Sequence, residues 1–131
     1  MAERDLRTLL AGMDPVLNPG RYVYCTFPGR VPTGLRPVVT VAEAEGVTAV
    51  VEQSEADALG LAYTFPSAWI TLRIHSALDA VGLTAAVAGR LTEHGISCNV
   101  VAGFHHDHLF VAAEHAEQAV KALGELAAES G

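Results

Sequence analysis

The sequence is poor in cysteine and lacks long apolar runs, and each shortage excludes a class of protein. Only two cysteines occur among 131 residues, and Cys25 and Cys98 lie far apart. This excludes a disulfide framework and a zinc site of the CxxC type. No apolar run approaches the roughly 18 residues of a membrane-spanning helix, and the charged N-terminal stretch lacks the apolar core of a secretory signal. We therefore expect a cytoplasmic protein with reduced thiols and no membrane contact.

Basic residues are also scarce. Eight lysines and arginines stand against fifteen acidic residues, which gives a net charge of −7. Proteins that bind nucleic acid usually carry a basic excess, so nucleic acid is not an expected partner. Half of the residues are apolar, which is enough for a sizeable core and argues against disorder. The length suits one ordinary domain or two very small units that pack together.

Hydrophobic spacing in the first half predicts short alternating elements. Leucines and a methionine at spacings of three and four predict a helix over residues 5–13, which Asp14-Pro15 ends. Strands are expected at 22–27, 38–42 and 47–51, the last two forming a hairpin. A short helix is expected over 54–59, with Ser54 as its N-cap.

The second half shows clearer periodicity. Residues 68–75 alternate between apolar and other side chains with a period of two, which predicts a strand with one buried face. Leu83, Val87 and Leu91 predict a helix over 83–94 that Gly95 ends in a left-handed conformation. The remaining expected elements are strands at 96–104 and 108–113 and a closing helix at 116–128.

The two halves repeat the same order of elements. A pair of valines at 38–39 recurs at 100–101, and two glutamates follow each pair at the same offset. Matching order with sparse identity indicates a degenerate repeat. We expect two units, residues 1–66 and 67–131, that form one compact body because each would be marginally stable alone.

The stretch between the strand at 68–75 and the next helix carries the most chemical information. Gly82 stands where the helix opens, and the first amides of a helix are unpaired and carry partial positive charge. Such a turn suits a carboxylate or phosphate. We hypothesise that the loop from Ser76 to Thr84 cradles a ligand carboxylate, and that Asp79 binds an ammonium group. A purely structural interpretation is also open, in which Asp79 caps the helix or pairs with Ser76.

This segment resembles the ACT domain family. In that family an aspartate is followed after three residues by a glycine, then by a leucine that opens a helix, and later by a Gly-Ile pair that enters the second strand. The matching positions in this chain are Asp79, Gly82, Leu83, Leu91, Gly95 and Ile96. The proline that usually precedes the glycine is Val81 here, so the turn is less rigid than is typical. The match covers about residues 68–128, and the first half resembles an ACT unit only in its order of elements.

The whole chain looks like the standalone tandem-ACT proteins of bacteria. The resemblance implies an α+β fold of two fused ferredoxin-like βαββαβ units, the first degenerate, with antiparallel sheets and helices on one face. It also implies non-catalytic sensing of a small molecule, commonly an amino acid, and the signal would pass to a regulated protein or through assembly. We expect a homodimer or a larger assembly. The implied ligand-binding residues are Ser76, Asp79, Val81, Gly82, Leu83, Thr84 and Asn99.

Two other functions stay open at this point. One is a ligand-free interaction module that associates through a sheet edge or a helix face. The other is a small metal-dependent enzyme that uses the histidine turn at His105, His106, Asp107 and His108, because imidazole and carboxylate groups suit zinc or nickel. A solvated hairpin tip also has this composition, and we expect no metal or other cofactor. No nucleophile elbow, P-loop or GxGxxG motif occurs, so no catalytic residue is expected.

Overall fold

The computed structural model describes residues 2–131. Contacts within the chain divide it into two compact units, Met1–Asn18 with Ala68–Gly131 and Pro19–Ser67. We call them the C-terminal unit and the central unit. The prediction that the sequence consists of two repeat units, residues 1–66 and 67–131, stays a prediction. In the folded chain, residues 2–18 pack with the second half.

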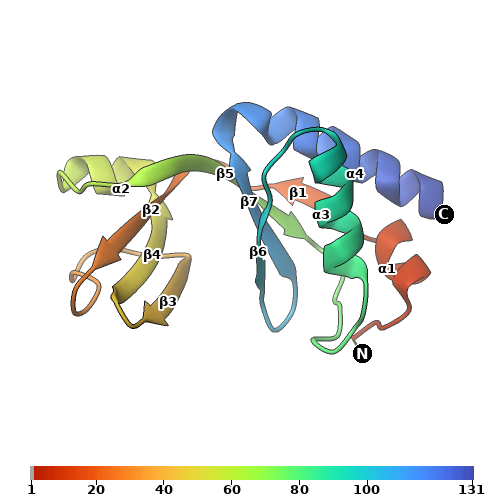
Figure 1. The fold of residues 1–131 in the computed structure, drawn as a ribbon, viewed down its shortest axis with the longest axis horizontal. Helices are drawn as coiled ribbons and strands as arrows, with labels where there is room; N and C mark the ends of the chain where they lie inside the picture. Colours follow the sequence, from red (N-terminus) through yellow and green to blue (C-terminus); the bar gives the residue numbers. More distant parts are fainter. Residues whose placement is uncertain (1) are drawn as a thin grey trace. The chain divides into compact units, whose positions relative to one another are not determined.

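The C-terminal unit is built from strands that carry helices on one face (Figure 1). Its strands lie in the order β1-β5-β7-β6, and β1 pairs antiparallel with β5. The elements are α1 (Leu6–Ala11), β1 (Pro15–Leu17), β5 (Thr64–Leu72, which begins in the central unit), α3 (Leu83–Glu93), β6 (Asn99–Ala102), β7 (Asp107–Ala112), a 3-10 turn (Ala113–His115) and α4 (Ala116–Ser130).

The core of this unit follows from the predicted periodicity. Alternate residues of β5 are buried, as are Leu83, Val87 and Leu91 at every fourth position of α3. Leu123 of α4 is fully buried in the same cluster. The helix α3 ends at Glu93, and Gly95 has φ +70°, which confirms its predicted left-handed conformation.

The central unit is smaller and has a small core. It contains β2 (Tyr22–Phe27), β3 (Val39–Glu43), β4 (Gly46–Glu52) and α2 (Gln53–Ala58), with strands in the order β3-β4-β2-β5. Its core cluster is Val23, Cys25, Ala49, Val51 and Ala56. The strand predicted at 22–27 and the hairpin predicted after it are confirmed.

Several expected boundaries are wrong for identifiable reasons. The first helix spans only Leu6–Ala11, because Asp5 is its N-cap and accepts from the Thr8 amide, and because Gly12, not Asp14-Pro15, ends it as the C-cap. The helix α2 has Glu52 as its N-cap, without a side-chain capping bond, so Ser54 lies inside the helix. The strand predicted at 68–75 spans Thr64–Leu72, since Thr64 and Ser67 pair with β2. The strand predicted at 96–104 is limited to Asn99–Ala102, because the Ile96 amide donates to the Leu91 carbonyl of α3 and the Gly103 amide donates to the His106 carbonyl at the hairpin tip.

Helix length decides whether any described helix could span a membrane. Among residues 2–131, the longest helix is α4 with 15 residues. None of the described helices is both long and apolar enough to span a bilayer.

Candidate functional site

The loop that joins β5 to α3 lies beside the N-terminal segment of the chain. Glu3 and Ser76 form a parallel backbone bridge. The Glu3 amide donates to the carbonyl of His75 and the Ala77 amide donates to the carbonyl of Glu3, both at 2.8 Å. Two segments more than 70 residues apart in sequence therefore lie side by side and form one wall of the cavity described below. The sequence did not predict the N-terminal part of this wall.

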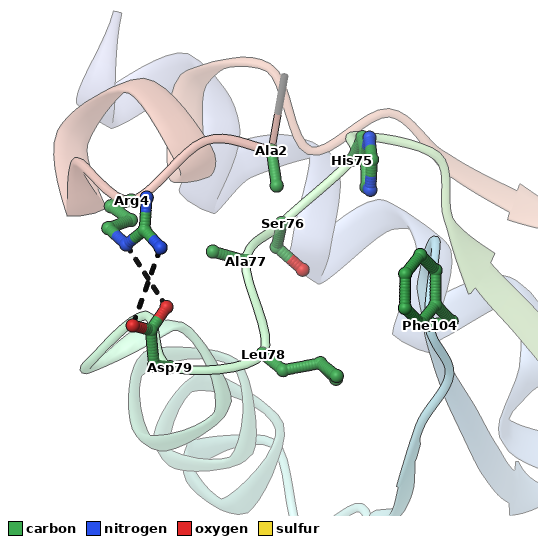
Figure 2. Close-up of a pocket in the computed structure, with 8 residues that line it drawn as sticks. All are labelled: Ala2, Arg4, His75, Ser76, Ala77, Leu78, Asp79 and Phe104. Carbon is green, nitrogen blue, oxygen red and sulfur yellow. Dashed lines mark hydrogen bonds and ion pairs between the residues drawn. The ribbon is translucent and has the colours of Figure 1, made fainter.

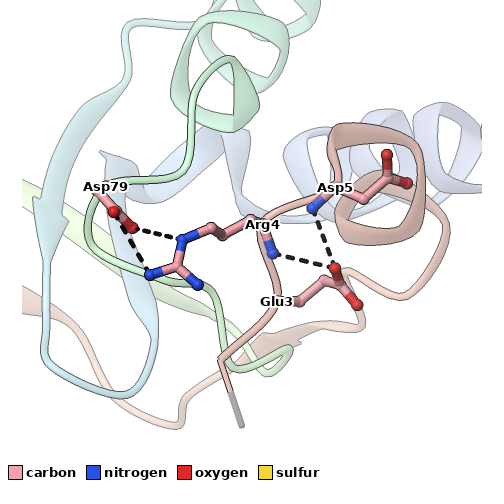
Figure 3. A network of polar contacts seen from close by, with 4 residues as sticks. All are labelled: Glu3, Arg4, Asp5 and Asp79. Carbon is pink, nitrogen blue, oxygen red and sulfur yellow. Dashed lines mark hydrogen bonds and ion pairs between the residues drawn. The ribbon is translucent and has the colours of Figure 1, made fainter.

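Arg4 brings a positive charge to this wall. Its Nε and Nη2 donate to the two carboxylate oxygens of Asp79, at 3.0 and 3.4 Å. Figure 3 shows this pair together with Glu3, whose Oε2 accepts from the backbone amides of Arg4 and Asp5. The Arg4 and Asp79 side chains are 64% and 71% exposed, so water reaches both groups.

An outer cavity of about 360 Å³ lies between the N-terminal segment, the loop and the tip of the β6–β7 hairpin. Figure 2 shows Arg4 and Asp79 on one side of it and Phe104 on the other, with Leu78 pointing toward Phe104. Its lining residues are Ala2, Arg4, His75, Ser76, Ala77, Leu78, Asp79 and Phe104. The cavity thus combines one ion pair with a mostly apolar surface.

An inner cavity of about 70 Å³ lies at the start of α3. Gly82 is the N-cap of this helix, with φ +103°, and no side chain caps the first amides. Ser76 Oγ donates to Asp107 Oδ2 at 3.0 Å within this cavity. Its lining residues are Ser76, Ala77, Leu78, Ala80, Leu83, Thr84, Ala102 and Asp107.

The structure distributes the predicted site residues unevenly between the two cavities. Ser76 lines both, Asp79 lines the outer cavity, and Leu83 and Thr84 line the inner one. The other three predicted residues, Val81, Gly82 and Asn99, line neither cavity.

Some of these residues have structural partners that the sequence did not predict. Asn99 donates from Nδ2 to the Phe110 carbonyl at 3.3 Å, across the β6–β7 pair. The alternative in which Asp79 caps α3 or pairs with Ser76 is wrong, because Gly82 is the cap and Asp79 pairs with Arg4.

Sequence reasoning predicted the loop from Ser76 to Thr84 but missed the cavity-lining residues that lie outside it, which are Ala2, Arg4, His75, Ala102, Phe104 and Asp107. Phe104 offered a usable signal in the sequence, because it is a large apolar residue directly before the predicted hairpin turn. In the fold its side chain is 73% exposed. Arg4 offered none, since it reaches the loop through contacts between distant segments.

Two side chains of the histidine turn, those of His106 and His108, have hydrogen-bond partners within the chain. His106 Nδ1 lies 3.3 Å from the Ile74 carbonyl oxygen. His108 Nδ1 lies 3.1 Å from Trp69 Nε1, which donates to it, and 3.1 Å from Thr71 Oγ1. Burial lowers the pKa of His108, the charge of His106 lowers it further, and Asp107 opposes both. Across residues 2–131, no three histidine, cysteine or acidic side chains are arranged to hold a metal ion.

Comparison with known proteins adds the family context. Models of the ACT domain match residues 1–68 and residues 64–125. A crystal structure of a Vibrio cholerae protein of unknown function, described as a possible transport protein, is 49% identical with a TM-score of 0.85. It covers 93% of this chain and 95% of its own. No curated protein matches the sequence.

More distant structures share the fold. A protein from Agrobacterium tumefaciens is 20% identical, with a TM-score of 0.69 over 86% of this chain and 87% of its own. The regulatory subunit of aspartate kinase from Thermus thermophilus, in its ligand-free form, is 12% identical, with a TM-score of 0.64 over 86% of this chain and 95% of its own. These likenesses confirm the predicted α+β, ferredoxin-like class.

Proposed function

The chain belongs to the ACT-domain family, as a tandem of two ACT units, and we propose that it is a non-catalytic sensor that binds an amino acid at the β5–α3 loop. ACT domains are small-molecule regulatory modules, which is the premise of the proposal. The amino acid as ligand and the loop as its site are our inference.

One observation carries the proposal: the β5–α3 loop separates two cavities that contain most of the predicted site residues. Ser76, Ala77 and Leu78 of this loop line both cavities, and the α3 amides at the inner cavity have no side-chain cap. Ligand pockets combine apolar walls with a few polar groups that orient the ligand, and the outer cavity has this composition. An amino acid needs one anionic and one cationic partner, and Asp79 and Arg4 supply both charges.

A non-catalytic role is supported by the state of the two thiols. Burial raises the pKa of both Cys25 and Cys98, which keeps them protonated and poorly nucleophilic. Both cysteines are unpaired. We further propose that the protein acts in the cytoplasm, because unpaired thiols persist in a reducing compartment.

A thermal-shift screen against the twenty amino acids tests the proposal. A ligand at one hundred times its Kd stabilises a protein by about 2.7 kcal/mol. For a chain of this length, that raises the Tm by several degrees. We expect one amino acid, or one chemical group of them, to give this shift in a concentration-dependent manner. The absence of a shift with all twenty would contradict the proposal.

A further inference from the structure

We propose that the outer cavity, rather than the inner one, holds the ligand, and that Arg4 and Asp79 select an amino acid with an apolar or aromatic side chain. The inference rests on the proposed function and deepens it, because it assigns the ligand class and adds Arg4 as a specificity residue. The juxtaposition that carries it is an exposed ion pair at one end of a cavity whose other walls are apolar (Figure 2).

The ion pair has unused bonding capacity on both sides. Arg4 uses Nε and Nη2 toward Asp79, and no partner for Nη1 lies within residues 2–131. Each Asp79 oxygen accepts from one arginine nitrogen and retains a further lone pair. A ligand carboxylate can therefore bind Arg4 and a ligand ammonium can bind Asp79 without separation of the pair.

The spacing of the two charges fits an α-amino acid. Its ammonium and carboxylate groups are attached to the same carbon, so their partners must lie side by side. Arg4 Nε and Asp79 Oδ1 are 3.0 Å apart, which meets this condition. An ion pair this exposed contributes little to stability, so replacing either member should leave the fold intact.

The rest of the outer cavity sets the side-chain preference. Leu78 and Phe104 are 66% and 73% exposed, which leaves two large apolar side chains facing water at its edge. An apolar or aromatic ligand side chain would cover them, and an aromatic ring can stack against Phe104. A charged ligand side chain would lose hydration against this surface without a compensating partner.

The inner cavity suits a ligand carboxylate less well. Its volume of about 70 Å³ is a fifth of that of the outer cavity, and the Asp107 carboxylate lies in its wall. The negative charge of Asp107 opposes the approach of a second carboxylate to the α3 amides. The outer cavity, at about 360 Å³, lies within the usual range for small-molecule pockets.

Calorimetric titration with L-phenylalanine tests the inference on the full chain. We expect Arg4→Gln and Asp79→Asn each to weaken binding at least tenfold. The matched control Arg30→Gln removes an exposed arginine from the central unit and should keep the wild-type affinity. Phe104→Ala should weaken L-phenylalanine more than L-alanine, whereas Leu59→Ala, an exposed apolar residue of the central unit, should weaken neither.

Two analogues separate the roles of the charges. Loss of the carboxylate in 2-phenylethylamine should remove the sensitivity to Arg4→Gln, and loss of the ammonium in 3-phenylpropionate should remove the sensitivity to Asp79→Asn. An unchanged L-phenylalanine affinity in Arg4→Gln would overturn the inference and leave the proposed function standing. Binding of only polar or charged amino acids would do the same. If the wild type binds none of the twenty amino acids, both the inference and the proposed function fail.

Discussion

Gly82 lies in the predicted binding turn and has a backbone conformation that favours glycine. Its φ of +103° lies in a region that residues with a side chain rarely adopt, and a Cβ atom at this position would lie 3.0 Å from Leu6 Cδ2. The glycine is thus required by the backbone whether or not a ligand binds nearby. Gly82 lines neither cavity, which makes its conformation the main reason for its presence.

We expect Gly82→Ala to lower the free energy of unfolding by about 1–3 kcal/mol, the usual cost of a strained backbone conformation. Denaturant titration measures it. The matched control is Gly89→Ala, inside α3 with no atom near its Cβ position, which should raise stability by about 0.5–1 kcal/mol. Equal effects at the two positions would contradict the strain argument.

At the scale of elements, strands β5 and β7 are joined by a polar contact as well as by their backbones. The Trp69 indole of β5 donates to His108 Nδ1 of β7, which requires a lone pair on that nitrogen. Protonation of Nδ1 removes the lone pair, so the contact needs a neutral imidazole. This agrees with the lowered pKa of His108, whose first cause is burial.

Stability should therefore depend on the charge of His108. The folded pKa lies below the ordinary 6.5, so the unfolded chain binds the proton first as the pH falls. The contribution is fully present above pH 6.5 and is lost as the pH falls through the folded pKa. Thermal unfolding between pH 7.5 and 5 should show a steeper loss of stability in the wild type than in His108→Gln. Equal slopes would show that His108 is not responsible.

At the scale of the molecule, edge strands leave backbone groups without a strand partner among the described residues. In the central unit β3 pairs only with β4, and in the C-terminal unit β6 pairs only with β7 and β1 only with β5. Val41 of β3 is 46% exposed, and most of that strand faces solvent. Exposed edges promote pairing with another copy of a chain unless they are covered.

We expect a homodimer or a larger discrete assembly, in which the net charge of −7 limits non-specific aggregation. Light scattering at tens of micromolar should give at least twice the monomer mass of 13.7 kDa. Val41→Lys, which places a charge on the β3 edge, should reduce association if that edge is the contact. A single monomeric species at this concentration would reject the expectation.

The sequence by itself determined the elements whose signal is local. The four-residue spacing of Leu83, Val87 and Leu91 and the alternation along β5 reflect which faces are buried, and both appear in the fold. Gly82 and Gly95 mark turns because each conformation is set within a few residues. The resemblance to the ACT family used four of these positions, Gly82, Leu83, Leu91 and Gly95, together with Asp79 and Ile96.

Only the tertiary structure decided what the N-terminal segment does. Pairing of β1 with β5, the bridge between Glu3 and Ser76, and the ion pair between Arg4 and Asp79 all join residues more than 50 positions apart. Such contacts join segments that are distant in sequence, so they depend on the folded arrangement of the chain. The segments that make them are too short to show a hydrophobic periodicity. The outer cavity therefore has a wall that the sequence did not predict, because its partners meet only after the sheet and helices have formed.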